Sequence, residues 1–249
     1  NNGHGLIEAT DQLRFNTGSL DNRGGRLRAL GQTGSSTFNI NTVFDNDQGL
    51  VEIGNQTLAV NSQSLTNRDG VVRHLGDQFL LDLGDAGQAG GSFFTNGRLS
   101  LNLDHWVNNS ELQARQIELN VNHFINDAAG VVRSIEDLQA SGNTWLNHGR
   151  IETDGSLSLV LSGGYQGRGA LHSQGDLHFS AASATLQQGA NVRSAANTVF
   201  ELGGRFQNEG TLTAVGTLQV RAHELENQGT LGAGQWLGIG AGQLLNQGL

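Results

Sequence analysis

The first candidates for catalytic side chains in this sequence are closely spaced aspartates. Asp45 and Asp47 stand two residues apart, and Asp21 precedes an Asn as Asp45 does. Clustered carboxylates beside an Arg or Lys perform the acid–base steps of polysaccharide hydrolases and lyases. Acids that flank Asn-containing turns are the simpler interpretation of the same residues, and we favour it. The sequence therefore predicts no catalytic residue and no enzyme.

Metal and nucleotide sites also need particular spacings. The eight histidines are dispersed, and no His-Glu-x-x-His or calcium-binding nonapeptide occurs. His105 and His123 each precede an aromatic residue, which predicts two solvated histidines at equivalent positions of neighbouring repeats. Gly163-Gly164 and Gly238–Gly240 lack the strand-to-helix context of a nucleotide site and are expected to form turns. The sequence thus predicts no metal and no cofactor.

The composition narrows the class of protein further. The 249 residues include 37 glycines but no proline, cysteine, methionine or lysine, and the net charge is −9. Such a chain has no disulfides, and its charge disfavours binding to nucleic acid or to anionic membranes. No apolar run approaches the length of a membrane-spanning helix. Because Met is absent and Asn1 comes first, we expect a piece of a longer chain.

The elements that position these residues follow from an internal repeat. A triplet of a large apolar residue, any residue and Asn recurs with a mean period of about 20 residues. Degenerate copies occur near Ala86 and Gln188, and Tyr165-Gln166-Gly167 carries Gly in place of Asn. The inward apolar residues of the other copies are Leu20, Phe44, Leu65, Trp106, Phe124, Trp145, Phe206, Leu225 and Leu244.

Each triplet leads into a glycine turn and then into short alternating strands. Three short strands cannot bury an apolar face alone, but stacked repeats can pair each strand with its equivalent about 4.8 Å away. The pattern predicts an all-β parallel β-helix of about 12 turns, with the apolar residues and the Asn residues in stacked columns. The outward sequence Glu8, Arg28, Glu52 and Arg73 alternates in charge, as favourable cross-strand pairing requires.

The Asn-x-Gly-x-Leu sequences Asn208–Leu212 and Asn227–Leu231, with Gly216–Val220, resemble haemagglutinin repeats. These repeats occur in filamentous haemagglutinin and in contact-dependent growth inhibition exoproteins. The resemblance implies a right-handed parallel β-helix, secretion to the cell surface of a Gram-negative bacterium, and export by an outer-membrane two-partner secretion transporter through a region outside residues 1–249. It also implies toxin delivery or adhesion by the complete exoprotein.

Two departures from the repeat could form an interaction surface. Long units occur at about 28–42 and 84–97 within one segment spanning residues 1–249, and insertions in repeat proteins form loops that can bind partners. Val107, Ile125 and Leu146 are apolar at a position that should face outward. We predict an interaction surface from these three residues with Phe93 and Phe94. Either the Phe93-Phe94 segment covers the stripe, or a partner or second protomer does, or it stays uncovered.

The predicted function is a stalk that presents a distal receptor-binding or toxin region. The alternative is an adhesin module that itself binds a receptor or glycan on a target cell through the long units. Neither alternative involves nucleic acid or insertion of this segment into a membrane.

Overall fold

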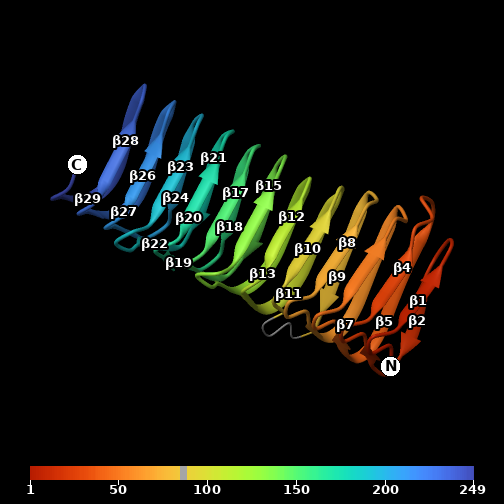
Figure 1. The fold of residues 1–249 in the computed structure, drawn as a ribbon. Helices are drawn as coiled ribbons and strands as arrows, with labels where there is room; N and C mark the ends of the chain where they lie inside the picture. Colours follow the sequence, from red (N-terminus) through yellow and green to blue (C-terminus); the bar gives the residue numbers. More distant parts are fainter. Residues whose placement is uncertain (85–88) are drawn as a thin grey trace. The chain divides into compact units, whose positions relative to one another are not determined.

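The structure, a computed structural model, describes residues 1–84 and 89–249, and the regular elements in these ranges are all β-strands (Figure 1). Parallel strands stack in about 12 turns of roughly 20 residues within the described chain, which is a β-solenoid, as the repeat period predicts. The chain forms two compact units, Asn1–Val121 and Asn122–Leu249, and each is described by itself. Residues 85–88, which include Ala86 and part of the loop in the second long unit, lie outside the described residues. Within those residues, no helix has the length and apolarity of a membrane span.

In the first unit, glycine turns separate strands of two sheets, and each turn of the chain adds strands to both. The order in the first sheet is β1 (Leu6–Ala9), β4 (Arg26–Ala29), β6 (Leu50–Ile53), β8 (Val71–His74), β10 (Ser92–Thr95) and β12 (Glu111–Ala114). The second sheet contains β2 (Arg14–Thr17), β3 (Leu20–Asp21), β5 (Ser35–Asp45), β7 (Thr57–Thr66), β9 (Gln78–Leu83), β11 (Arg98–Asn108) and β13 (Gln116–Asn126), whose end enters the second unit.

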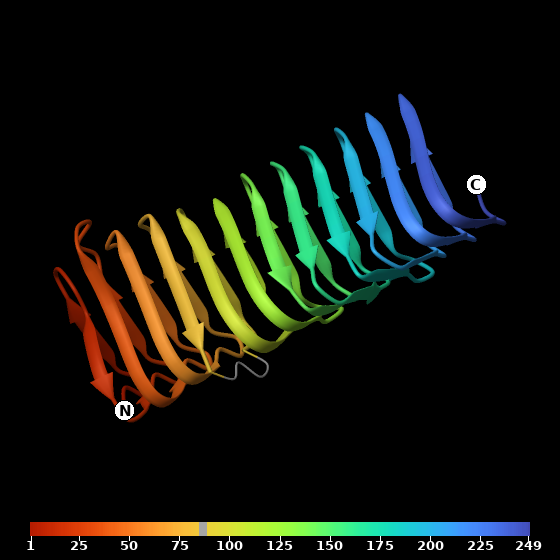
Figure 2. The ribbon, with the colours of Figure 1, turned by 180° about the vertical axis from the view of Figure 1, so that it is seen from behind.

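The second unit repeats this plan, and Figure 2 shows its strands in green, turquoise and blue. Its first sheet has the order β14 (Val131–Ser134), β17 (Arg150–Thr153), β20 (Ala170–Ser173), β23 (Asn191–Ser194), β26 (Thr211–Ala214) and β28 (Thr230–Ala233). Its second sheet contains β15 (Leu138–Gly142), β16 (Thr144–Asn147), β18 (Leu157–Leu161), β19 (Gly164–Gly167), β21 (Leu177–Ala181), β22 (Ser183–Leu186), β24 (Thr198–Leu202), β25 (Arg205–Asn208), β27 (Thr217–Asn227) and β29 (Trp236–Asn246).

The core of each unit consists of the predicted apolar columns. Phe124 pairs with Trp145, and Trp145 pairs with Tyr165, in one continuous register. The rings of Phe124 and Trp145 lie 4.5 Å apart, and both side chains are buried. Leu244 continues its column but is 55% exposed, because β29 is the last strand of the described sheet. The predicted inward column is thus confirmed by the register within each unit.

The outward register confirms the predicted alternation of charge. Glu8 pairs with Arg28, Arg28 with Glu52, and Glu52 with Arg73 along the first sheet. Arg28 Nη1 lies 3.6 Å from Glu8 Oε2. Phe94 takes the next place in this column, opposite Arg73, so the interrupted copy of the repeat keeps its register.

Candidate interaction surfaces

A ladder of buried asparagine amides connects successive turns. In this ladder the Nδ2 of one Asn donates to the Oδ1 of the Asn in the following turn, and these side chains are buried except at Asn246. In the first unit the bonds join Asn2, Asn22, Asn46 and Asn67 at 2.7, 2.6 and 2.6 Å. In the second unit they join Asn126 to Asn147 at 2.8 Å, and Asn208, Asn227 and Asn246 at 2.7 and 2.7 Å. Because buried amides are costly to leave unpaired, the ladder fixes the stacking register.

Tyr165 replaces the missing amide where the ladder meets Gly167. Gly167 pairs with Asn147 in the register, and a Cβ at position 167 would lie 1.9 Å from the backbone oxygen of Asn147. The Asn147 amide instead donates to the Tyr165 hydroxyl at 3.1 Å. Burial raises the pKa of Tyr165, so this hydroxyl stays protonated. The sequence predicts that Tyr165 lies in the core, but it does not predict this hydrogen bond. The one signal for it is Gly167, which stands where the other triplets carry Asn.

A second, exposed polar column runs along the second sheet of the first unit, and the sequence analysis missed it. Its members are Asn16, Asn39, Asn61, Asp82, Asn102 and Asn120, which pair or bond in sequence. Asn61 donates to Asn39 at 2.8 Å, and Asn120 donates to Asn102 at 2.9 Å. Asp82 lies between Asn61 and Asn102 in this column. An ionised carboxylate has no hydrogen to donate to the side-chain oxygen of Asn61, whereas an Asn at this position would have one.

The acids considered for catalysis are engaged in turns. Arg23 bonds to Asp21 at 2.8 Å and lies 3.5 Å from Asp45, while Arg68 lies 3.1 Å from Asp47. Asp45 also accepts the backbone N–H of Asp47 at 3.0 Å. The side-chain hydrogen bond from Arg23 lowers the pKa of Asp21 to about 2. Asp21 is thus an ionised partner of Arg23 in this turn.

The three residues of the predicted apolar stripe face outward on the second sheet, but Phe93 and Phe94 lie on β10 in the first sheet. Ile125 is 40% exposed, its register partner Leu146 is half-buried, and Val107 in the first unit is half-buried. Phe94 is half-buried on the outer face of β10. Phe93 is only 1% exposed, so its assignment to an interaction surface is wrong. Strand alternation turns Phe93 into the core because it pairs with Val72 and Leu112.

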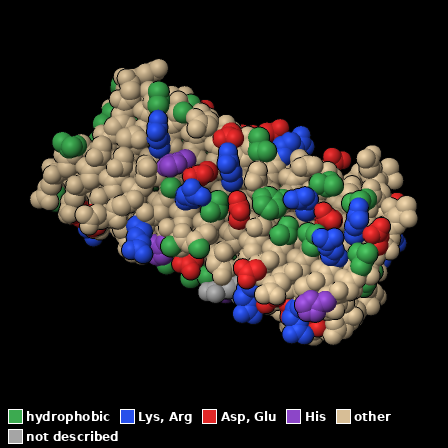
Figure 3. Space-filling model, in the orientation of Figure 1, with side chains coloured by type: hydrophobic (Ala, Val, Ile, Leu, Met, Phe, Trp, Pro, Cys, Tyr) green, Lys and Arg blue, Asp and Glu red, His purple; other side chains and the backbone are tan. Residues whose placement is uncertain are grey.

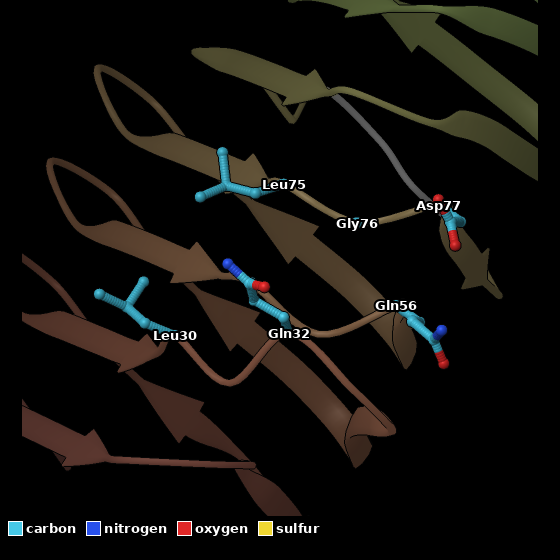
Figure 4. Close-up of a pocket in the computed structure, with 7 residues that line it drawn as sticks. Leu30, Gln32, Gln56, Leu75, Gly76 and Asp77 are labelled. Carbon is cyan, nitrogen blue, oxygen red and sulfur yellow. The ribbon is translucent and has the colours of Figure 1, made fainter.

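The first long unit forms a groove of about 470 Å³. Its extra residues form the loop Leu30–Gly34 between β4 and β5. The groove is lined by Leu30, Gln32, Gly54, Gln56, Leu75, Gly76 and Asp77. Figure 4 shows Leu30 and Leu75 at one end and Gln56 and Asp77 at the other. Leu30 and Leu75 are 43% and 45% exposed, so the groove combines an apolar wall with amide and carboxylate groups.

On the face that Figure 3 shows, charges are mixed rather than gathered by sign. Figure 3 shows Arg side chains next to Asp and Glu, with hydrophobic side chains between them. His105 lies 2.8 Å from the Asp104 carboxylate, and His123 bonds to Thr144 at 2.7 Å. Among residues 1–84 and 89–249, no three His, Cys, Asp or Glu side chains are close enough to hold a metal ion.

The fold and these surfaces define a β-solenoid whose polar side chains mainly bond to neighbouring turns. No protein-family model, curated protein or solved structure matches the chain.

Proposed function

We propose that this chain is a structural segment of a secreted cell-surface exoprotein, and that it presents a distal receptor-binding or toxin region. The observation that carries the proposal is the buried amide ladder, which joins turn to turn within each unit. The resemblance to haemagglutinin repeats supports the same role. The resemblance implies a two-partner secretion system at the surface of a Gram-negative cell, for adhesion or contact-dependent inhibition.

The physical basis is that a stacked repeat is a spacer. Strand pairing joins each turn to its neighbours, so stability grows with each repeat and interface. Closely packed aromatic pairs, such as Phe179 and Phe200 with rings 4.0 Å apart, keep adjacent turns in contact throughout a unit. Such a segment holds its two ends apart without needing a site of its own.

Removal of one turn tests this role in the complete exoprotein displayed on cells. Deletion of Thr211–Gly229 joins Gly210 to Thr230, which is the register partner of Thr211, and leaves Asn208 to bond to Asn246. We expect surface display and target-cell attachment to persist. The control deletion, Thr211–Val220, removes about half a turn, breaks the register and should abolish display. Loss of attachment by a properly displayed one-turn deletion would contradict the stalk.

The alternative function, recognition of a target-cell receptor or glycan by this segment itself, rests on the groove of the first long unit. Leu75→Arg places a charge in the groove, whereas Val215→Arg places it at an equally exposed corner of the second unit. If only Leu75→Arg abolishes attachment while both proteins are displayed, the segment is a binding module. Equal attachment of both variants supports the stalk.

A further inference from the structure

A buried polar cluster lies behind the groove, at the inner edge of the first sheet. We name Ser36, Asn55, His74 and Thr95 the polar clasp; each comes from a successive turn, and Ser36, Asn55 and His74 have no exposed surface. His74 Nε2 lies 2.9 Å from the backbone oxygen of Asn55. His74 Nδ1 lies 2.8 Å from the Thr95 hydroxyl. The equivalent positions in most other turns carry small side chains, such as Ala29 and Ala114, and the preceding turn carries Ile53.

Asn55 connects this histidine to the loop Leu30–Gly34. Its Oδ1 accepts a hydrogen bond from Ser36 Oγ at 2.6 Å. Its Nδ2 lies within bonding distance of three backbone oxygens, those of Asp11, Gly31 and Thr33 at 2.9, 3.0 and 2.8 Å. Two of these oxygens belong to the loop, so the clasp holds the loop that carries Leu30 and Gln32 of the groove.

The hydrogen bonds around His74 suit its neutral form. A backbone oxygen can only accept, so Nε2 carries the hydrogen and Nδ1 accepts from the Thr95 hydroxyl. Thr95 Oγ1 already accepts the Gly97 N–H at 3.1 Å. A second proton on Nδ1 would make it a donor, so the Thr95 hydroxyl would have to turn its hydrogen away from the ring and accept from both Nδ1 and the Gly97 N–H. Charging the ring therefore reverses the hydrogen bond between His74 and Thr95 and places a charge in the core.

Burial favours the neutral ring. It lowers the pKa of His74 below its ordinary value of 6.5, and the hydrogen bond to the Asn55 oxygen and the nearby Asp77 oppose this shift without reversing it. Glu52 on the neighbouring strand β6 and Arg73 on β8, the strand of His74 itself, lie on the outward face of the sheet. Because the opened state binds the proton first, the closed loop keeps its full stability above pH 6.5. It loses stability as pH falls from 6.5 through the lower pKa of the folded state.

We propose that the polar clasp is an acid-sensitive catch, which holds the loop Leu30–Gly34 closed at neutral pH and releases it on acidification, changing the wall of the groove. Each pH unit in the sensitive range raises the opened population by up to about tenfold, because one proton is taken up. The groove follows the clasp because its residues adjoin the clasp residues in sequence: Gln56 follows Asn55, and Leu75 follows His74.

Hydrogen exchange of the whole chain tests the catch at pH 7.5 and 5.5, with rates corrected for intrinsic exchange chemistry. We expect wild-type protein to lose protection in residues 30–36 at the lower pH. The His74→Gln variant should show no such change, while His178→Gln, which alters an exposed histidine of the second unit, should behave as wild type. Unchanged protection in the wild type, or a pH response that survives in His74→Gln, would overturn the proposal.

A second measurement serves if His74→Gln does not fold. The ring resonances of His74 in the wild-type protein are followed by NMR against pH. A midpoint below 6.5, accompanied by shifts of the Gly31 and Thr33 amides, supports the catch. A midpoint at or above 6.5, or titration without any change in the loop, contradicts it.

Discussion

Replacement of Asn46 by Ala removes the central member of the buried ladder in the first unit. The Asn46 side chain accepts a hydrogen bond from Asn22 at 2.6 Å and donates one to Asn67 at 2.6 Å. All three side chains have no exposed surface. The substitution therefore leaves one buried donor and one buried acceptor on opposite sides of a small cavity.

The loss of folding stability follows from the two buried groups that lose their hydrogen-bond partners, the Asn22 donor and the Asn67 acceptor. A buried polar group that loses its partner costs about 1–3 kcal/mol, which gives a range of about 2–6 kcal/mol for the pair. Asn22 keeps a longer bond of 3.4 Å to the Gly25 oxygen, which lowers its share. We therefore expect a loss of about 3 kcal/mol. For a chain of this size, that loss lowers Tm by about 6–12 °C, at about 2–4 °C per kcal/mol.

Thermal and guanidinium unfolding followed by circular dichroism measure this loss. The matched control is Asn61→Ala, which removes a similar amide bond of 2.8 Å from the exposed column. Water can solvate the exposed Asn39 amide oxygen that loses its partner, so the control should lose less than about 1 kcal/mol of folding stability. Equal losses of unfolding free energy for the two variants would refute this reasoning, because burial would then not determine how much an amide ladder stabilises the fold.

Three other substitutions test the stacking. Tyr165→Phe should lower folding stability by about 1–2 kcal/mol, because one N–H of the buried Asn147 amide then has no acceptor. An unchanged urea midpoint would contradict this role. Asp82→Asn should raise stability by about 0.5 kcal/mol by giving the Asn61 carbonyl a donor, and a lower Tm would argue against it. Trp145→Ala should cost about 3–5 kcal/mol in equilibrium unfolding because the ring is 2% exposed, and a loss near zero would remove it from the core.

The parallel stacking was predictable because its signals recur. The apolar–x–Asn triplet repeats often enough that a single irregular copy does not hide the period, and the register of Phe44 with Leu20 and Leu65 follows from it. The exact place of a degenerate copy was harder to find. The copy expected near Gln188 has Leu186 in the Asn column, because Leu186 pairs with Gly167 and Asn208.

The interaction surface was less predictable because a repeat pattern specifies which way a side chain points, but not what neighbouring irregular segments do. The prediction grouped Phe93 with Phe94 as one covering segment. Adjacent residues of a strand point to opposite faces, so the assignment of a repeat position to Phe93 would have placed it in the core.

The clasp shows where a usable signal was present but unused. Positions that carry Ala, Ser or Thr in most turns carry His74 in one turn of the first unit. A histidine in a column of small inward residues is expected to have hydrogen-bond partners in the core, since a buried imidazole needs a partner for each ring nitrogen. Here the partners are the Asn55 carbonyl and the Thr95 hydroxyl, and through Asn55 they extend to the inserted loop. The insertion and the unusual inward histidine are thus parts of one feature. A repeat-by-repeat comparison that searches for an insertion together with a polar core residue could find similar loops in other solenoids.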